Sequence, residues 1–407
     1  MARRSTSPDT PPRIASDLRG VGRLAIDGVT SLTDVVEAMH AAVAHLPPVV
    51  GRPAPARTTG LARLVYGSVR GVTRLVGHGV DLSLSRLAAG VGTSSASPQR
   101  EALVAALNGV LGDHLEASGN PLAIRMQLRR EGAPLPLTRK QLAAHLPKAS
   151  GKLLLQIHGL CMNDLQWHHR GHDHGAALAR DVGYTPVHLH YNSGRRISTN
   201  GQEFAGLLEQ LVAAWPVPVQ EITLLCHSMG GLVARSALDV GFSQGLHWSK
   251  LPIRVVFLAT PHHGAPLERA GSWADQLISI SPYSAPLVRL GQMRSAGIQD
   301  LRHGNVRDSD WQGRDFLDRV DARTPVPLPE PVRAYAIAAT TQHPRNDGNN
   351  RTLRGDGLVP IASAFGEHAD DAFDVRIPES QRWVGHGLHH LGLLGSDAVY
   401  QRLVRWL

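Results

Sequence analysis

The chain has 407 residues, of which 42% are hydrophobic and 19% charged, a balance typical of a globular protein with a large core. This length exceeds one plain module, so we expect a full domain with an extension. The two cysteines are too few for a disulfide framework, and no stretch approaches the ~20 apolar residues of a membrane span. These features exclude a disulfide-rich secreted scaffold and a transmembrane protein.

The positive charge of the chain is concentrated in its first part. Residues 1–150 contain 18 Lys and Arg against 10 Asp and Glu, whereas residues 151–407 contain 24 of each, so the whole excess of +8 precedes the core. No aromatic interleaving or nucleic-acid motif accompanies this charge, so nucleic-acid binding is not expected. Residues 1–12 carry basic side chains without a following apolar segment, which argues against a signal peptide. We therefore expect a cytoplasmic protein, which would be membrane-peripheral if residues 60–89 bind lipid.

Residues 1–118 are expected to form a basic helical extension. Its first helix is predicted over residues 31–46. A capping box at Ser31 and Asp34 would start this helix, and the prolines that begin at Pro47 would stop it.

A second helix is predicted over residues 60–89 of the extension. Its apolar positions fall on one side, with Arg63, Arg70 and Arg74 opposite. A basic amphipathic helix can lie on an anionic membrane. It can equally be a helix that packs on the protein with its arginines in water, and the sequence leaves both interpretations open.

Residues 119–407 alternate apolar strands with helical segments, which is typical of a mostly parallel sheet covered by helices on both faces. A period-2 pattern marks a strand over 122–129, and a turn leads from it to a strand at 135–137. Buried strands are then expected at 153–157, 187–191, 222–225, 253–259 and 332–338, with a helix at 204–214 and a final amphipathic helix.

A long insertion, about residues 265–330, separates the last two of these strands. It contains several aromatic side chains, among them Trp273, Tyr283 and Trp311. Its length and aromatic content favour a lid over an apolar pocket, and the alternative is a surface excursion without a special role.

Residues 222–238 read as a short apolar strand, a tight turn of small residues and a helix, with Ser228 at the apex. A serine hydroxyl is a poor nucleophile, so an enzyme must hold its Oγ on a sharp turn near a base and near backbone N–H donors. The usual pattern is G-x-S-x-G, and Cys226 stands here in place of the first glycine. Cysteine is small enough for the turn, so Ser228 is the predicted nucleophile.

A second loop can supply an oxyanion hole. The strand at 153–157 runs into His158 and Gly159, which allows the backbone N–H of Leu160 to point to the same place as the N–H of Met229. A simple turn at the end of a strand is the alternative reading.

The acid and the base are expected further along the chain. Asp356 lies between two glycines, where a carboxylate can point inward, although Asp-Gly is also a common turn. Three histidines follow, His386, His389 and His390. A metal site is not expected because no cysteine or carboxylate cluster accompanies them. His390 is the predicted base, since it directly precedes an apolar segment, 391–394, that would anchor its loop.

The strings IHGLCMND, LLCHSMGGLVARSAL, LATPHHGAPLERAG, GDGLVP, HHLGLL and VYQRLVRWL resemble the lipase and esterase branch of the α/β-hydrolase superfamily. Within it they are similar to bacterial hydrolases that resemble the GPI inositol-deacylase catalytic domain. The resemblance covers roughly residues 120–407. It implies an α/β-hydrolase fold with a lid insertion, a triad and an oxyanion hole, here Ser228, Asp356, His390, Leu160 and Met229.

These observations predict a serine hydrolase of carboxylic esters, with an acyl ester of a lipid or other apolar molecule as substrate and no cofactor. Two alternatives stay open: an acyltransferase that uses the same triad, and a catalytically silent membrane-peripheral binding protein that keeps the fold. Cys161 and Cys226 follow strands that are neighbours in the resembled fold, so a bridge is conceivable, and two buried free thiols are expected. The sequence does not indicate acyl length, head group or oligomeric state.

Overall fold

The computed structural model describes residues 13–44, 63–71, 97–264, 275–276, 278–279, 295–313, 323–343 and 355–407. The chain divides into two compact units. The N-terminal unit comprises residues 1–97 with 115–123, and the sheet unit comprises residues 98–114 with 124–407. Residues 98–114, expected within the extension, therefore belong to the sheet unit.

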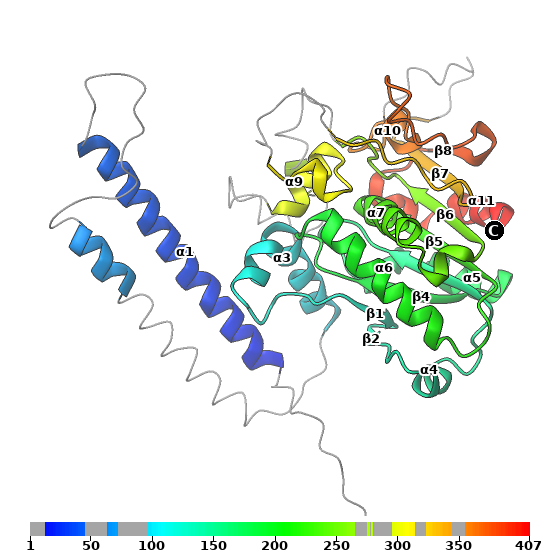
Figure 1. Cartoon of the computed structure of the whole chain (residues 1–407), viewed down its shortest axis with the longest axis horizontal. Coiled ribbons are helices and arrows are strands. Elements are labelled where there is room, and N and C mark those ends of the chain that lie inside the picture. The colour runs from blue at the N-terminus through cyan, green and yellow to red at the C-terminus, as the bar shows by residue number, and fades with distance from the viewer. Residues whose placement is uncertain are drawn as a thin grey trace, which may run out of the picture. The chain divides into compact units, whose positions relative to one another are not determined.

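The sheet unit is built on an eight-stranded sheet with the order β2-β1-β4-β3-β5-β6-β7-β8 (Figure 1). In this spatial order, the six strands β4, β3, β5, β6, β7 and β8 pair in parallel. Strand β1 is antiparallel to both β2 and β4. Their bounds are β1 Gln127–Arg130, β2 Ala133–Pro134, β3 Lys152–Ile157, β4 Thr185–His190, β5 Glu221–His227, β6 Ile253–Leu258, β7 Arg333–Thr340 and β8 Arg382–His386.

Helices cover both faces of this sheet. On one face, α5 and α11 enclose a core with side chains from β3, β6 and β7, and α6 and α7 lie over the other face. The helix bounds are α3 Pro98–Ala117, α4 Arg139–His145, α5 His174–Val182, α6 Ile197–Ala214, α7 Met229–Ser243, α9 Ala296–His303, α10 Ile361–Phe365 and α11 Asp397–Trp406. Short 3₁₀ turns are η1 Asp164–Trp167, η2 His247–Lys250, η5 Asp308–Asp310, η7 Glu379–Gln381 and η8 His390–Gly395.

The predicted parallel strands are present with small shifts at their ends, as is the predicted α/β architecture. The first predicted strand, 122–129, is shorter than expected, because only Gln127–Arg130 pairs with neighbouring strands. The strand predicted at 135–137 is wrong: β2 is Ala133–Pro134, within the predicted turn, and 135–137 contain no strand. The structure adds β8, which the sequence did not suggest. This strand lies at the edge of the sheet and is only half-buried, so it lacks the continuous apolar run that marks the inner strands.

In the N-terminal unit, α1 spans Arg13–Ala44. The predicted helix start at Ser31 is therefore wrong. Ser31 lies inside a continuous helix, where the backbone N–H groups bond to carbonyls one turn earlier and need no cap. The described helix reaches Ala44, and the predicted stop at Pro47 lies outside the described residues.

A second helix over residues 63–71 is the described part of the predicted helix 60–89; Arg74 lies outside the described residues. Arg70, predicted to face water, is instead 8% exposed. Its Nη1 bonds Asp34 Oδ1 at 2.8 Å and Glu37 Oε2 at 2.5 Å. The prediction for Arg70 was wrong because the acidic partners come from a distant part of the chain.

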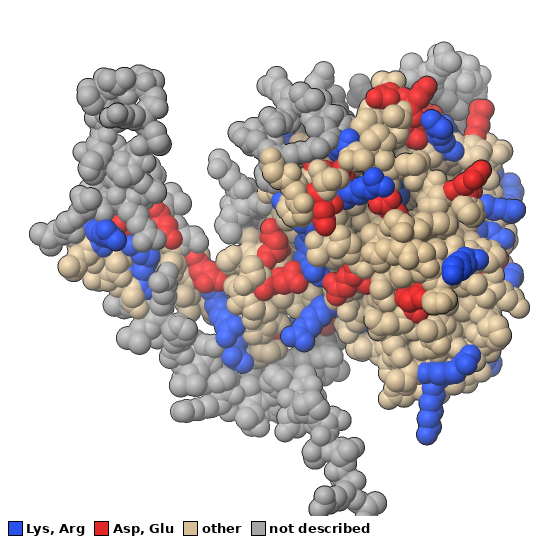
Figure 2. All heavy atoms as spheres, viewed as in Figure 1, with Lys and Arg blue, Asp and Glu red and all other residues tan. Residues whose placement is uncertain are grey.

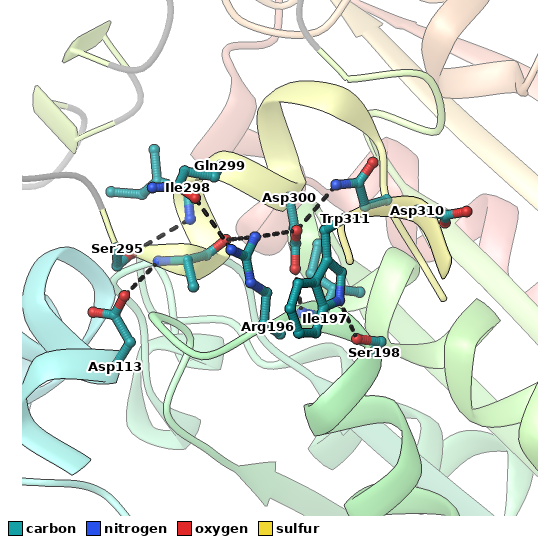
Figure 3. A network of polar contacts seen from close by, with 12 residues as sticks. Asp113, Arg196, Ile197, Ser198, Ser295, Ile298, Gln299, Asp300, Asp310 and Trp311 are labelled. Atoms are coloured by element: carbon teal, nitrogen blue, oxygen red, sulfur yellow. Dashed lines mark hydrogen bonds and ion pairs between the residues drawn. The ribbon is translucent and has the colours of Figure 1, made fainter. Parts of the chain in front are cut away.

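Residues 295–313 of the insertion are fixed to the rest of the sheet unit by a polar network (Figure 3). Arg196, at the start of α6, donates to Asp300 Oδ1 at 2.8 Å, and the N–H of Ile197 donates to Asp300 Oδ2 at 2.9 Å. Trp311 Nε1 donates to Ser198 Oγ at 3.1 Å, and the Arg196 guanidinium lies 4.5 Å from the centre of the Trp311 ring. Asp300 is fully buried, so this polar network, which we call the clamp, lies inside the sheet unit.

The same segment also contacts α3. Ser295 Oγ donates to Gly109 O at 2.7 Å, and the N–H of Ala296 donates to Asp113 Oδ2 at 2.8 Å. Trp311 and its neighbours are therefore attached to the sheet unit by hydrogen bonds. The lid over about residues 265–330 stays a prediction, and residues 265–274, 277, 280–294 and 314–322 lie outside the described residues.

Candidate active site

Ser228 sits between the end of β5 and the start of α7. Its φ of 52° and ψ of −125° lie in a region that residues other than glycine rarely adopt. Such strained backbone is concentrated at functional sites, where the surrounding contacts hold it. Here the N–H of Ser228 donates to Leu258 O at 2.9 Å, and Ser228 O accepts from the N–H of Gly231 at 3.0 Å. The side chain is held on a sharp turn, as a nucleophile elbow requires.

The glycines after Ser228 allow α7 to approach the sheet. A Cβ on Gly230 would lie 2.3 Å from Ile157 O, and one on Gly231 would lie 2.0 Å from Thr260 Oγ1. Neither position has room for a side chain. The sequence Met-Gly-Gly thus sets the distance between the helix and the strands β3 and β6.

Gly230→Ala is expected to lower the free energy of unfolding by about 1–3 kcal/mol, because the new methyl group would press on backbone that cannot yield easily. Gly206 in α6 is a matched control, since it is exposed and no atom lies within 4 Å of the place that an added methyl group would take. Gly206→Ala should raise stability by about 0.5–1 kcal/mol. Urea unfolding of both variants would measure this, and equal midpoints would contradict the packing argument.

Asp356 and His390 form a buried pair. His390 Nδ1 donates to Asp356 Oδ2 at 2.7 Å, and both residues are 2% exposed. Asp356 Oδ1 accepts from the N–H groups of Leu358 and Val359 at 2.9 and 2.8 Å. Burial alone would raise the pKa of the Asp356 carboxyl. The charge of His390 and the hydrogen bonds outweigh burial and lower this pKa below its usual value.

When His390 is neutral, the bond to Asp356 fixes its proton on Nδ1 and leaves a lone pair on Nε2. Both His390 Nε2 and Ser228 Oγ are buried and lack a hydrogen-bond partner among the described residues. The structure gives the other two histidines different positions: His389 is exposed, and His386 ends β8 half-buried. Of the predicted candidates, His390 is the one that contacts Asp356.

The loop after β3 lies against the elbow. A Cβ on Gly159 would be 3.1 Å from Ser228 Cβ, so the glycine permits this approach. The N–H groups of Leu160 and Met229 have no hydrogen-bond partner within the part of the chain that the structure describes. The next residue, Cys161, has a φ of 60° and donates its N–H to Ser193 Oγ at 3.1 Å, which holds the loop.

Both cysteines are free and buried, as expected. Burial raises the pKa of the Cys161 thiol to about 12 and raises that of Cys226 as well. Neither thiol is therefore a reactive nucleophile at neutral pH.

Several buried histidines around the site received no role from the sequence. His227 Nε2 lies 3.2 Å from His390 O, with the two ring centres 4.7 Å apart. His174 Nε2 lies 2.8 Å from Leu393 O, in the same 3₁₀ turn as His390. His158 stacks on Tyr191 with ring centres 4.3 Å apart, and burial lowers its pKa to about 3. For His174, the sequence offers one signal, the high density of histidine at residues 168–174.

Among the described residues, no group of three or more His, Cys, Asp or Glu side chains is arranged to hold a metal ion. Within the same residues, no helix is long and apolar enough to cross a membrane. Basic and acidic side chains are interspersed over the described surface of the sheet unit that Figure 2 shows.

Comparison with known families gives a match to the PGAP1-like alpha/beta domain over residues 148–317. This segment contains Ser228, both candidate oxyanion loops and the clamped part of the insertion. The fold is that of the α/β-hydrolase superfamily. The resemblance inferred from the sequence motifs is confirmed, and the matched segment ends before Asp356 and His390.

The solved structures that the chain matches include a lipase of Bacillus licheniformis in its mature form. The identity is 16%, 69% of this chain and 97% of that chain are covered, and the TM-score is 0.42. An esterase of Pyrococcus furiosus shows 13% identity, 64% and 81% coverage, and a TM-score of 0.39. A comparison with curated proteins finds no match.

Proposed function

We propose that this α/β-hydrolase cleaves carboxylic esters through an acyl-enzyme. The observation that supports the proposal most strongly is the buried hydrogen bond between His390 Nδ1 and Asp356 Oδ2. It leaves His390 Nε2, like Ser228 Oγ, buried and without a hydrogen-bond partner among the described residues. A buried hydroxyl and a buried imidazole nitrogen without partners are costly in a structural role and useful in catalysis.

In the proposed reaction, His390 Nε2 takes the Ser228 proton while Oγ attacks the ester carbonyl. Asp356 holds the imidazole in the required tautomer and stabilises the imidazolium. The free N–H groups of Leu160 and Met229 would hold the oxyanion. His390 then protonates the leaving alcohol, and water, activated by the same nitrogen, releases the acid and regenerates the enzyme.

The substrate class is a proposal of its own. The aromatic insertion favours an acyl ester of a lipid or another apolar molecule. A series of p-nitrophenyl esters of increasing chain length, assayed with and without added alcohols, tests it. Release of p-nitrophenol that rises with chain length supports the apolar substrate. Acyl transfer to the alcohol in preference to water would favour the acyltransferase, and the absence of any turnover would favour a silent binding protein.

A peripheral membrane contact is proposed for the helix at residues 63–71. Leu64, Val65 and Val69 are 69%, 54% and 42% exposed, which is unusual for three neighbouring large apolar side chains. Residues 1–150 also carry the whole net positive charge of the chain. An apolar face combined with basic charge is what an anionic lipid surface attracts.

Replacement of Leu64, Val65 and Val69 by glutamine is expected to reduce sedimentation with anionic vesicles by about tenfold or more, because each apolar side chain loses its transfer free energy. Ser68→Gln is the control: Ser68 is exposed on the same helix, and its replacement removes neither a charge nor a large apolar side chain, so vesicle binding should change little. Unchanged binding of the triple variant would exclude this surface as the membrane contact.

A further inference from the structure

The 3₁₀ turn η8, which carries His390, is held by two imidazoles. His227 Nε2 lies 3.2 Å from the carbonyl oxygen of His390 itself, and His174 Nε2 lies 2.8 Å from that of Leu393. The two histidines come from different elements, the end of β5 and the start of α5. They are 163 and 219 positions away from the residues that they contact, so each bond fastens η8 to a distant part of the fold.

The chemistry of these contacts fixes where the protons lie. A carbonyl oxygen only accepts, so each histidine carries its hydrogen on Nε2. His174 Nδ1 is then an acceptor when the ring is neutral, and His172 Nε2 donates to it at 2.9 Å. Burial lowers the pKa of His227 to about 3 and that of His174 to about 4, so both rings are neutral near pH 7.

The bond to Asp356 does not by itself fix the place of His390. It sets the rotation of the ring, whereas the position of the ring follows from the backbone of η8. Turns of the 3₁₀ type have poor hydrogen-bond geometry, so they depend on contacts with their surroundings. A displacement of about 1 Å in a catalytic group can cost on the order of 10²-fold in rate.

We propose that His227 and His174 are positioning residues that anchor η8. They bond the carbonyls of His390 and Leu393 and thereby hold His390 Nε2 in place for proton transfer with Ser228. This inference rests on the proposed function of Ser228 and His390. His227 and His174 do not act as bases in it, because their Nε2 protons are committed to the carbonyls.

A matched pair of variants at residue 227 tests the first anchor. His227→Phe keeps an aromatic ring and removes the donor, whereas the side-chain amide of His227→Gln places an N–H near the former Nε2. We expect the phenylalanine variant to lose about 10–100-fold in kcat with KM changed by less than about threefold, because base placement matters in the transition state and not in substrate binding. The glutamine variant should recover most of this loss.

The variants His174→Phe and His174→Gln test the second anchor. We expect the phenylalanine variant to have the lower kcat of the two. The rate of Ser228 labelling by a fluorophosphonate should fall in parallel with kcat. Full kcat in both phenylalanine variants, or glutamine variants as impaired as the phenylalanine ones, would overturn the proposal.

A measurement on the parent protein separates this proposal from the proposed function. Long-range ¹H–¹⁵N NMR spectra report imidazole tautomers, and His227 and His174 should both appear as the Nε2–H form at pH 7. The opposite tautomer at either residue overturns its anchoring role even if Ser228→Ala is inactive. Correct tautomers together with a fully active Ser228→Ala variant would overturn the catalytic part, because η8 would then be anchored without serving Ser228.

Discussion

Ser228→Ala is expected to abolish ester hydrolysis, with a fall in kcat on the order of 10⁶, because the acyl-enzyme cannot form without Oγ. The hydroxyl has no hydrogen-bond partner among the described residues, so its removal should leave the thermal unfolding of the protein nearly unchanged. The measurement is kcat for a short chromogenic ester, together with labelling by a fluorophosphonate probe, which the variant should also lose.

Ser243→Ala is a suitable control for this experiment. Ser243 lies at the other end of the same helix and is exposed, and its one side-chain hydrogen bond to the described residues goes to Val240 O of the same helix at 3.0 Å. The control should label and turn over like the parent. Retained activity in Ser228→Ala would rule out the proposed nucleophile.

His390→Ala should be nearly as inactive as Ser228→Ala, since loss of the base from such a triad typically costs about as much as loss of the serine. His389→Ala and His386→Ala should keep most of the parent turnover, because neither ring bonds Asp356. Steady-state kinetics of the three variants at one pH distinguish these cases. If His389→Ala or His386→Ala were the inactive variant, the base would have to be reassigned.

Much of the fold was predictable because the inner strands are continuous apolar runs. Strands such as β3 and β5 are buried on both faces, so their composition alone marks them. The edge strand β8 escaped prediction because it alternates little and contains Gly385. The start of α1 was misjudged for a local reason: Ser31 and Asp34 fit a capping pattern, but nothing in the preceding residues breaks a helix.

The candidate site, like the fold, was predictable from the sequence only in part. Ser228 was predictable from a local strand–turn–helix pattern, and the contact of His390 with Asp356 was expected from the order of motifs along the chain. The roles of His227 and His174 could not be predicted, because their contacts join residues far apart in sequence and involve only backbone oxygens of η8. A carbonyl acceptor leaves no trace in the identity of the residue that provides it. Arg70 was misjudged for a different reason, because its acidic partners, Asp34 and Glu37, lie 36 and 33 positions earlier in the sequence.

The order of the strands also bears on when the protein becomes active as it folds. The elbow at Ser228 needs only β5 and its neighbours β3 and β6, but Asp356 and His390 follow β7 and β8, at the far edge of the sheet. Contacts across such long stretches of chain form slowly, because the entropy of loop closure is lost before the contacts repay it. A refolding chain should therefore bury Trp215 and Trp248 before it gains a reactive serine, and the appearance of hydrolysis would report the docking of the last strand.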